Sequence, residues 1–164
     1  MRNMHGYSYL EILTALAIVS VLALVISTFA NPAWHLRREY DAVREDGVRD
    51  YMEALLDLQL EELDAFEPIF SEIEGQRAMI GTGESCAGGF GDQCSDEILS
   101  DTCLDLTDEL IPIYLESLPI DPREGFSENQ TGYYVSYVGG VFEVGACNPE
   151  SRNEIILTKR FSWE

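Results

Sequence analysis

The feature that most constrains the fold of this chain is an uninterrupted apolar run near its N-terminus. Residues 12–30 are 19 consecutive positions without one charged side chain. As an α-helix this run would be about 28 Å long, at about 1.5 Å per residue, which matches the hydrocarbon core of a bilayer. The sequence therefore predicts one membrane-spanning helix, and the rest of the chain must fold outside it.

One carboxylate, that of Glu11, lies at the N-terminal edge of the apolar run. A carboxylate in hydrocarbon costs on the order of 2.5–3.5 kcal/mol, so such a group usually has a partner and a function. A short polar leader, residues 1–6, precedes the run and ends at Gly6. An ordinary secretory signal instead ends its apolar core at a small-residue cleavage site, and Ala-Asn-Pro at residues 30–32 is a poor one.

The order of a polar leader, Gly6, the aromatic Tyr7 and Glu11 resembles the class III signal of type IV pilins and type II secretion pseudopilins. The resemblance implies that a prepilin peptidase cuts between Gly6 and Tyr7 and methylates the new N-terminus. It also implies that Glu11 pairs with the positive N-terminus of a neighbouring subunit. Tyr9 departs most from the family pattern, which reads Phe, Thr, Leu, Ile or Val, and Glu. The alternative is a plain signal anchor in which Glu11 has no such role.

Downstream of Pro32 the sequence predicts a second, amphipathic helix that continues to about Ile73. Proline kinks or interrupts a helix because it lacks an N–H donor and clashes with the preceding turn. Apolar residues then recur at spacings of three, four and five, which fits one buried helix face. These residues are Val43, Val48, Tyr51, Met52, Leu55, Leu58, Leu63, Phe66 and Phe70. Acidic residues between them, such as Glu53 and Asp57, indicate a solvated opposite face.

Residues 74–118 are expected to form a loop followed by short helices. The stretch 74–95 is rich in glycine and shows no periodicity, which is typical of a loop. Ser95 and Thr107 each precede acidic residues and are expected to be N-caps of short helices.

The C-terminal residues 119–164 predict a three-stranded antiparallel sheet. The expected strands are Tyr133–Val138, Val141–Ala146 and Glu154–Lys159. Only Gly139-Gly140 separates the first two, and such a two-residue link is a strong hairpin signal. The order of a short helix, a Pro-x-Asp-Pro segment and these strands is also similar to the closing part of many bacterial pilins.

The predicted fold class is therefore α+β and pilin-like. One long N-terminal helix, with a membrane half and an amphipathic half, packs on a small three-stranded antiparallel sheet. The predicted divisions are a leader (1–6), a transmembrane and filament-core helix (7–31), an amphipathic helix (32–73), a loop with short helices (74–118) and a β-sheet region (119–164).

Four cysteines, Cys86, Cys94, Cys103 and Cys147, follow the apolar run. An exported domain meets an oxidising environment, in which disulfides form. Four cysteines allow three pairings and the sequence does not choose between them. Of the three we favour Cys86–Cys94 with Cys103–Cys147. Their spacings lack the paired CxxC arrangement of zinc sites, and no metal site is predicted there.

Asp121 occupies a loop that in major pseudopilins leads towards a calcium site. This chain lacks the later Gly-Asp-rich ligand segment, so we predict no metal there either. The histidines are His5 in the leader and His35 near the apolar run. A Ser-His or Cys-His pair would lack a base in the C-terminal domain, and the sequence predicts no enzyme, no catalytic residue and no cofactor.

The charge of the chain limits its partners. Thirty acidic residues against 10 basic ones give a formal net charge of −20. Nucleic-acid affinity comes largely from phosphate neutralisation by Lys and Arg, so a nucleic-acid partner is not expected. Docking to anionic lipid headgroups is disfavoured for the same reason.

The resemblance implies a structural subunit of a type IV pilus-like extracellular filament, stored in the inner membrane before assembly. The implied partners are further copies or other pilins, prepilin peptidase and an inner-membrane assembly platform. Two alternatives remain open. One is a type II secretion pseudopilin, whose short filament pushes cargo through an outer-membrane pore. The other is a membrane-anchored binding module that never polymerises and keeps Met1.

Overall fold

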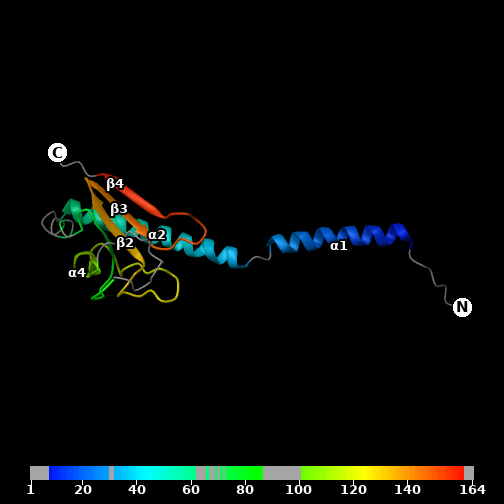
Figure 1. Ribbon diagram of the computed structural model, residues 1–164, viewed down its shortest axis with the longest axis horizontal. Coiled ribbons are helices and arrows are strands. Elements are labelled where there is room, and N and C mark those ends of the chain that lie inside the picture. The colour runs from blue at the N-terminus through cyan, green and yellow to red at the C-terminus, as the bar shows by residue number, and fades with distance from the viewer. Residues whose placement is uncertain are drawn as a thin grey trace. The chain divides into compact units, whose positions relative to one another are not determined.

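The structure is a computed structural model that describes residues 8–29, 32–61, 66, 69, 71, 73–86 and 101–160. The chain divides into two compact units, residues 1–36 and 37–164. In chain order the elements are α1 (Tyr9–Phe29), α2 (Pro32–Glu61), β1 (Arg77–Met79), α4 (Thr107–Leu110), β2 (Tyr133–Val138), β3 (Val141–Ala146) and β4 (Ile156–Arg160) (Figure 1). The described residues thus form the mixture of an apolar N-terminal helix and an antiparallel sheet that the sequence predicts.

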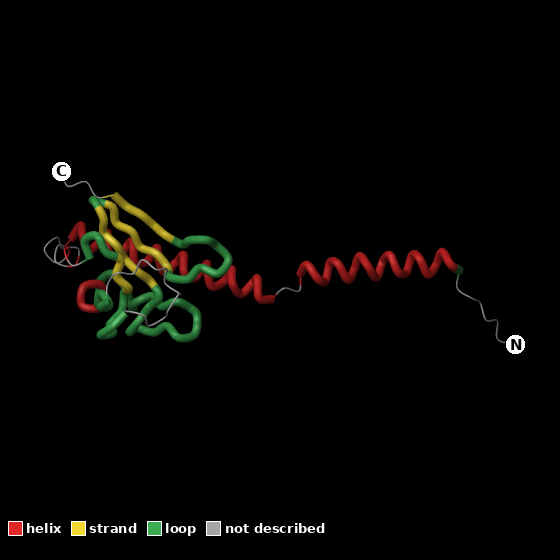
Figure 2. Tube along the Cα trace, in the orientation of Figure 1, coloured by secondary structure: helices red, strands yellow, loops and turns green. Residues whose placement is uncertain are grey.

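The sheet has four antiparallel strands in the order β1-β2-β3-β4 (Figure 2). Strands β2 and β3 have the predicted bounds, and β4 begins two residues later than expected. Gly139 and Gly140 join β2 to β3 with φ angles of 58° and 80°. Positive φ at both central residues is what the favoured two-residue hairpin turn requires, and glycine adopts it without a steric penalty.

The predicted strand count of three is wrong, because β1 lies in the stretch that was expected to be a loop. Its three residues pair with the middle of β2, with Met79 opposite Tyr134 and Ala78 opposite Val135. A strand this short is stabilised by its neighbour, which lies more than fifty residues later in the chain. No local alternation of apolar and polar residues marks it.

Helix α2 covers one face of the sheet with its apolar side (Figure 2). Proline suits the first position of the helix, where its missing N–H would have no partner. The buried residues of α2 are Val48, Tyr51, Met52, Ala54, Leu55 and Leu58. They pack with Tyr133, Val135, Phe142 and Val144 of β2 and β3 in the main hydrophobic core. The predicted helix face is therefore buried, except that Val43 is 48% exposed. Leu63 and Phe70 lie outside the residues whose side chains are described.

A smaller apolar cluster covers the opposite face of the sheet. It contains Met79, Tyr134, Cys86 and Cys147, with Cys103 packed against it. Arg77 lies over the Tyr134 ring at 4.9 Å and binds the Glu143 carboxylate at 2.8 Å. The opposite face is therefore covered around β1 and β2, whereas Leu157–Arg160 of β4 are exposed.

Helix α4 begins at Thr107, so the prediction that Thr107 is an N-cap is wrong. Leu106 holds the cap position and makes no side-chain capping bond. The Asp105 carboxylate instead accepts a hydrogen bond from the Thr107 backbone N–H at 2.9 Å. The capping acceptor thus comes from a position two residues before the predicted one. The other predicted cap, Ser95, is outside the described residues.

Candidate functional site

The first candidate site is α1 itself, which is apolar on every side. All its described side chains from Tyr9 to Ser27 are exposed. Three of its hydroxyl groups are paired within the helix: Thr14 donates to the Glu11 carbonyl, Ser20 to the Leu16 carbonyl and Ser27 to the Ala23 carbonyl, at 2.7–3.0 Å. Polar groups paired in this way do not need water. A helix that is apolar all round is suited to a lipid or protein environment rather than to water.

The stretch Tyr9–Ser27, 19 residues long, has the length and composition of a membrane-spanning helix. At about 1.5 Å per residue it would extend about 28 Å, close to the thickness of the hydrocarbon core. It lies near the N-terminus, as the position of the apolar run predicts.

Glu11 lies in the first turn of α1. Negative charge is favourable at this end of a helix, because the first backbone N–H groups carry the positive end of the helix dipole. Its own backbone N–H donates to the Ser8 carbonyl at 2.9 Å. Its side chain is exposed, and no described residue makes an ion pair or a hydrogen bond with its carboxylate. The predicted processing residues Gly6 and Tyr7 lie outside the described residues.

A second arrangement, which the sequence analysis missed, is a buried ion cluster centred on Arg44 of α2. Arg44 and Asp121 are fully buried and form a bidentate pair, with Nε–Oδ2 at 2.6 Å and Nη2–Oδ1 at 3.0 Å. Arg44 also binds Asp41 at 2.8 Å and Glu150 at 3.3 Å. Bidentate Arg–carboxylate pairs fix relative orientation as well as charge. The cluster therefore ties α2 to two loops distant in sequence.

Asp41 extends the cluster to the loop before β4. Its carboxylate accepts hydrogen bonds from the backbone N–H groups of Glu150 (2.9 Å), Ser151 (2.6 Å) and Arg152 (3.2 Å), and from the Ser151 hydroxyl. Burial by itself raises the pKa of Asp41. The Ser151 hydroxyl, the backbone N–H groups and Arg44 outweigh burial and lower this pKa to about 2. Asp41 is therefore ionised throughout the ordinary pH range.

The ion cluster also shifts the pKa of Arg44, in the opposite direction to that of Asp41. Burial lowers the pKa of Arg44, but the bonds to Asp121 and Asp41 more than offset this and raise it. The guanidinium therefore stays charged inside the protein. In the structure Asp121, which the sequence places in a possible calcium loop, directs both its carboxylate oxygens to Arg44. The sequence carries no local signal for this pair, because it shows neither that Asp121 is buried nor which of the nine arginines binds it.

The cysteines are joined differently from the favoured pairing. Cys86 is bonded to Cys103, with their Cα atoms 4.9 Å apart. This bond excludes both Cys86–Cys94 and Cys103–Cys147. Cys147 is also disulfide-bonded, and Cys94 lies outside the described residues. The pairing follows from β1, since Leu104 bridges to Ile80 at the end of that strand and brings the two chain segments together.

Residue His35 packs edge-on against Trp34, with ring centroids 5.4 Å apart. Both lie in the first turn of α2.

Comparisons with known protein families, with curated proteins and with solved structures found no match to this chain.

Proposed function

We propose that this protein is a structural subunit of a type IV pilus-like extracellular filament. The observation that carries the proposal is α1: a helix of membrane-spanning length, apolar on every side, whose one carboxylate is in its first turn. Such a helix resides in the bilayer before assembly and packs with copies of itself in the filament core afterwards. The acidic sheet domain then lies on the outside, in water.

Processing supplies the partner of Glu11. Prepilin peptidase hydrolyses the bond between Gly6 and Tyr7, and Tyr7 gains a positively charged amine. The Glu11 carboxylate of an incoming subunit pairs with the amine of its neighbour. A single charge in hydrocarbon is costly, whereas an ion pair costs less, so the pairing favours one axial register over others.

Support comes from three features of the chain. The leader and the Gly6–Glu11 spacing resemble the pilin signal. The hydroxyl groups of Thr14, Ser20 and Ser27 are satisfied within the helix, so these three do not oppose its burial. The α+β domain places a helix against one face of an antiparallel sheet, which is the arrangement that the resemblance implies.

The test is Glu11→Ala and Glu11→Gln in the full chain, expressed with a prepilin peptidase and an assembly platform. We expect both variants to insert and to be cleaved, because the apolar helix is unchanged. The sheared surface filament fraction should fall at least about tenfold, since breaking a buried pair typically costs 3–5 kcal/mol. The matched control is Glu39→Gln, which neutralises an exposed carboxylate on α2 and should assemble normally.

The N-terminal residue and the mass of the sheared material complete the test. A methylated Tyr7 in a sedimentable fibre supports the proposal. Normal filaments from Glu11→Ala would overturn the role of Glu11. A Met1 terminus found only in the membrane fraction would overturn the filament itself and favour an anchored binding module.

A further inference from the structure

Strand β4 forms one edge of the sheet and pairs with β3 on its inner side only (Figure 1). The other edge is covered, because the Leu104 backbone N–H donates to the Met79 carbonyl of β1 at 2.8 Å. Among the described residues, only those of β3 make backbone hydrogen bonds with β4. An open edge of this kind is a template on which a further strand can pair.

The register of β3 and β4 shows which backbone groups lie on the open edge. The Ala146 N–H donates to the Ile155 carbonyl at 3.0 Å, and the register places these two residues directly opposite each other. In an antiparallel pair, residues that bond to the neighbouring strand alternate with residues whose N–H and C=O groups point away from it. The odd-numbered residues of β4 therefore bond to β3. The outward groups belong to the even-numbered residues, which are Ile156, Thr158 and Arg160.

The open edge also carries charges that no described residue neutralises. Lys159 and Arg160 are exposed and make no ion pair within the described part of the chain. Glu154, just before β4, is likewise exposed and without an ion pair there. Glu154 and Arg160 are six residues apart, so in an extended chain their side chains lie on the same face. One strand thus presents both an unpaired acid and an unpaired base along its free edge.

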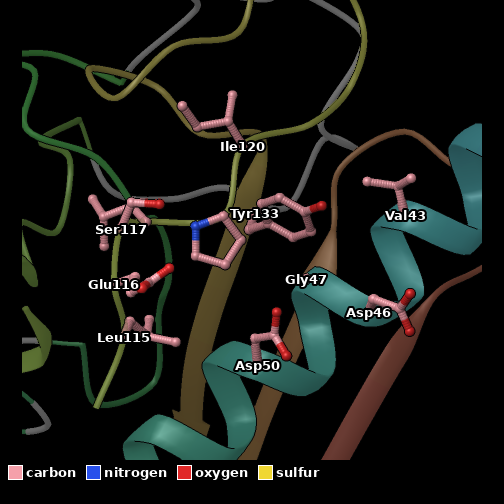
Figure 3. A pocket seen from close by; sticks show the side chains of 11 residues that line it. Val43, Asp46, Gly47, Asp50, Leu115, Glu116, Ser117, Ile120 and Tyr133 are labelled. Atoms are coloured by element: carbon pink, nitrogen blue, oxygen red, sulfur yellow. The ribbon is translucent and has the colours of Figure 1, made fainter. Parts of the chain in front are cut away.

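Elsewhere the domain presents acids that would repel a second copy. Asp46 and Asp50 lie one turn apart on α2, and Glu116 faces them across a pocket (Figure 3). No lysine or arginine lines this pocket. In a protein with a net charge of −20, such a surface disfavours contact with another copy. The uncompensated positive charge on β4 makes the open edge the more favourable face for approach.

We propose that two copies of this chain pair through the open edges of their β4 strands, which run antiparallel about a two-fold axis at Leu157. In this register Glu154 of each copy lies opposite Arg160 of the other. Ile156 lies opposite Thr158, and both have outward backbone groups, so the sheet continues from one copy into the next. Opposite charges that face each other across antiparallel strands stabilise the pair, and like charges destabilise it.

Charge selects this register over the next one that the backbone allows. With the axis at Thr158 the same backbone groups would meet, but Arg160 would lie opposite Ile156 and both Glu154–Arg160 pairs would be lost. With the axis at Leu157, this side chain, which is 39% exposed, also meets its own copy. The contact goes beyond the filament proposal, because a two-fold contact is closed and does not by itself extend a fibre.

The first test is the oligomeric state of the full chain, measured by sedimentation equilibrium in density-matched non-ionic detergent. The contact is small, so protein at about 0.3 mM is used. We expect a reversible dimer. Thr158→Pro should abolish it by removing an outward N–H, and this variant should fold because that N–H makes no bond to β3. A monomeric wild type, or a Thr158→Pro protein that dimerises as well as the wild type, would overturn the proposal.

Charge-reversal variants test the register. Arg160→Glu and Glu154→Arg, each alone, place like charges opposite each other at both ends of the contact and should weaken the dimer about tenfold. The double variant Glu154→Arg/Arg160→Glu should restore it. The matched control is Glu154→Arg/Lys159→Glu, which has the same net charge but leaves two arginines opposite each other and should stay weak. Equal affinity of the two double variants would mean that net charge alone acts, and the register would be wrong.

Cross-linking locates the two-fold axis. Leu157→Cys places a thiol on the axis, where Cα atoms of a non-hydrogen-bonded pair are about 4.5 Å apart, within the range of a disulfide. Oxidation with copper phenanthroline should therefore join two copies, whereas Thr158→Cys should not cross-link. Cross-linking by Thr158→Cys alone would move the axis and overturn the charge-paired register. These variants leave Glu11 and α1 unchanged, so failure of the dimer would leave the filament proposal intact, and failure of filament assembly would leave the dimer intact.

Discussion

Residues Arg44 and Asp41 lie one turn apart on α2, and both are buried. Removing two charges from water is expensive, and their attraction offsets this only where the remaining donors and acceptors are also satisfied. Here the condition is met. Asp121 and Glu150 accept further hydrogen bonds from Arg44, and the backbone N–H groups of Ser151 and Arg152 donate to the second Asp41 oxygen. The cluster therefore behaves as one unit, and removal of a single member leaves the others uncompensated.

The first prediction concerns Asp41→Asn and pH. The pKa of Asp41 is lowered in the folded protein from 3.8 to about 2. A carboxyl group whose pKa is lower in the folded than in the unfolded chain stabilises the fold at pH values above its unfolded pKa. This stabilisation is lost as the pH falls through the folded pKa. The shift corresponds to about 2 kcal/mol. We expect Asp41→Asn to be less stable than the wild type by about this amount at pH 6, and the difference to shrink as pH falls from about 4 to 2.

Urea denaturation of both proteins at pH 6, 4, 3 and 2 measures this difference. The control is Asp57→Asn, an exposed carboxylate with no partner among the described residues, whose effect should be small at every pH. If the free energies of unfolding of Asp41→Asn and the wild type differ by the same amount at every pH in this range, the prediction is wrong.

Of the two charged side chains discussed above, Glu11 could be identified from the sequence and Arg44 could not. Glu11 stands out because it is the one charge beside an apolar run. Arg44 does not, because it is one of several charged residues in an amphipathic helix. Two of its three carboxylate partners lie 77 and 106 residues further along the chain. Only the folded chain shows that it points inward.

At the scale of elements, the helices and strands that could be predicted are those whose signal lies in a few neighbouring residues. The apolar run and the Gly139-Gly140 hairpin carry their signals within a few residues, and α1, β2 and β3 follow them. Strand β1 and the Cys86–Cys103 bond depend on contacts between distant segments. Such contacts have no local pattern, so the fourth strand and the pairing were missed.

The second prediction concerns the contact between α2 and β2. A Cβ atom on Gly47 would lie 2.5 Å from the Tyr133 hydroxyl oxygen and 2.7 Å from ring carbon Cζ. Ala would ordinarily stabilise a helix interior by about 1 kcal/mol relative to Gly. Overpacking against a buried ring costs about 1–3 kcal/mol. Because Tyr133 is fully buried, we expect Gly47→Ala to lower the free energy of unfolding by up to about 2 kcal/mol.

Chemical denaturation measures that change, and Asp57→Ala is the matched control. It gains the helix propensity of alanine on an exposed face and should be neutral or slightly stabilising. If Gly47→Ala is as stable as Asp57→Ala, then the close approach of α2 to β2 is not a constraint on this position.

At the scale of the whole molecule, charge is the dominant property. A net charge of −20 keeps separate copies apart, whereas the proposed filament would bring these domains together. Repulsion between exposed charges depends on the Debye length, which is about 30 Å at 0.01 M salt and about 8 Å at 0.15 M. Contacts between apolar α1 helices are not screened in this way. The proposed filament should therefore be held together by its core and opposed by its surface.

The last prediction follows from this balance. Sheared filaments moved into 0.01 M NaCl at pH 7 should lose sedimentable material relative to 0.5 M NaCl, and sucrose of matched osmolality should not replace the salt. Lowering the pH to about 4 at low salt should restore sedimentation, because exposed carboxylates begin to protonate there. Asp41 stays ionised at that pH, since its pKa is about 2, so its hydrogen bonds to the backbone of residues 150–152 are retained. Equal sedimentation at both salt concentrations would mean that surface repulsion does not limit assembly.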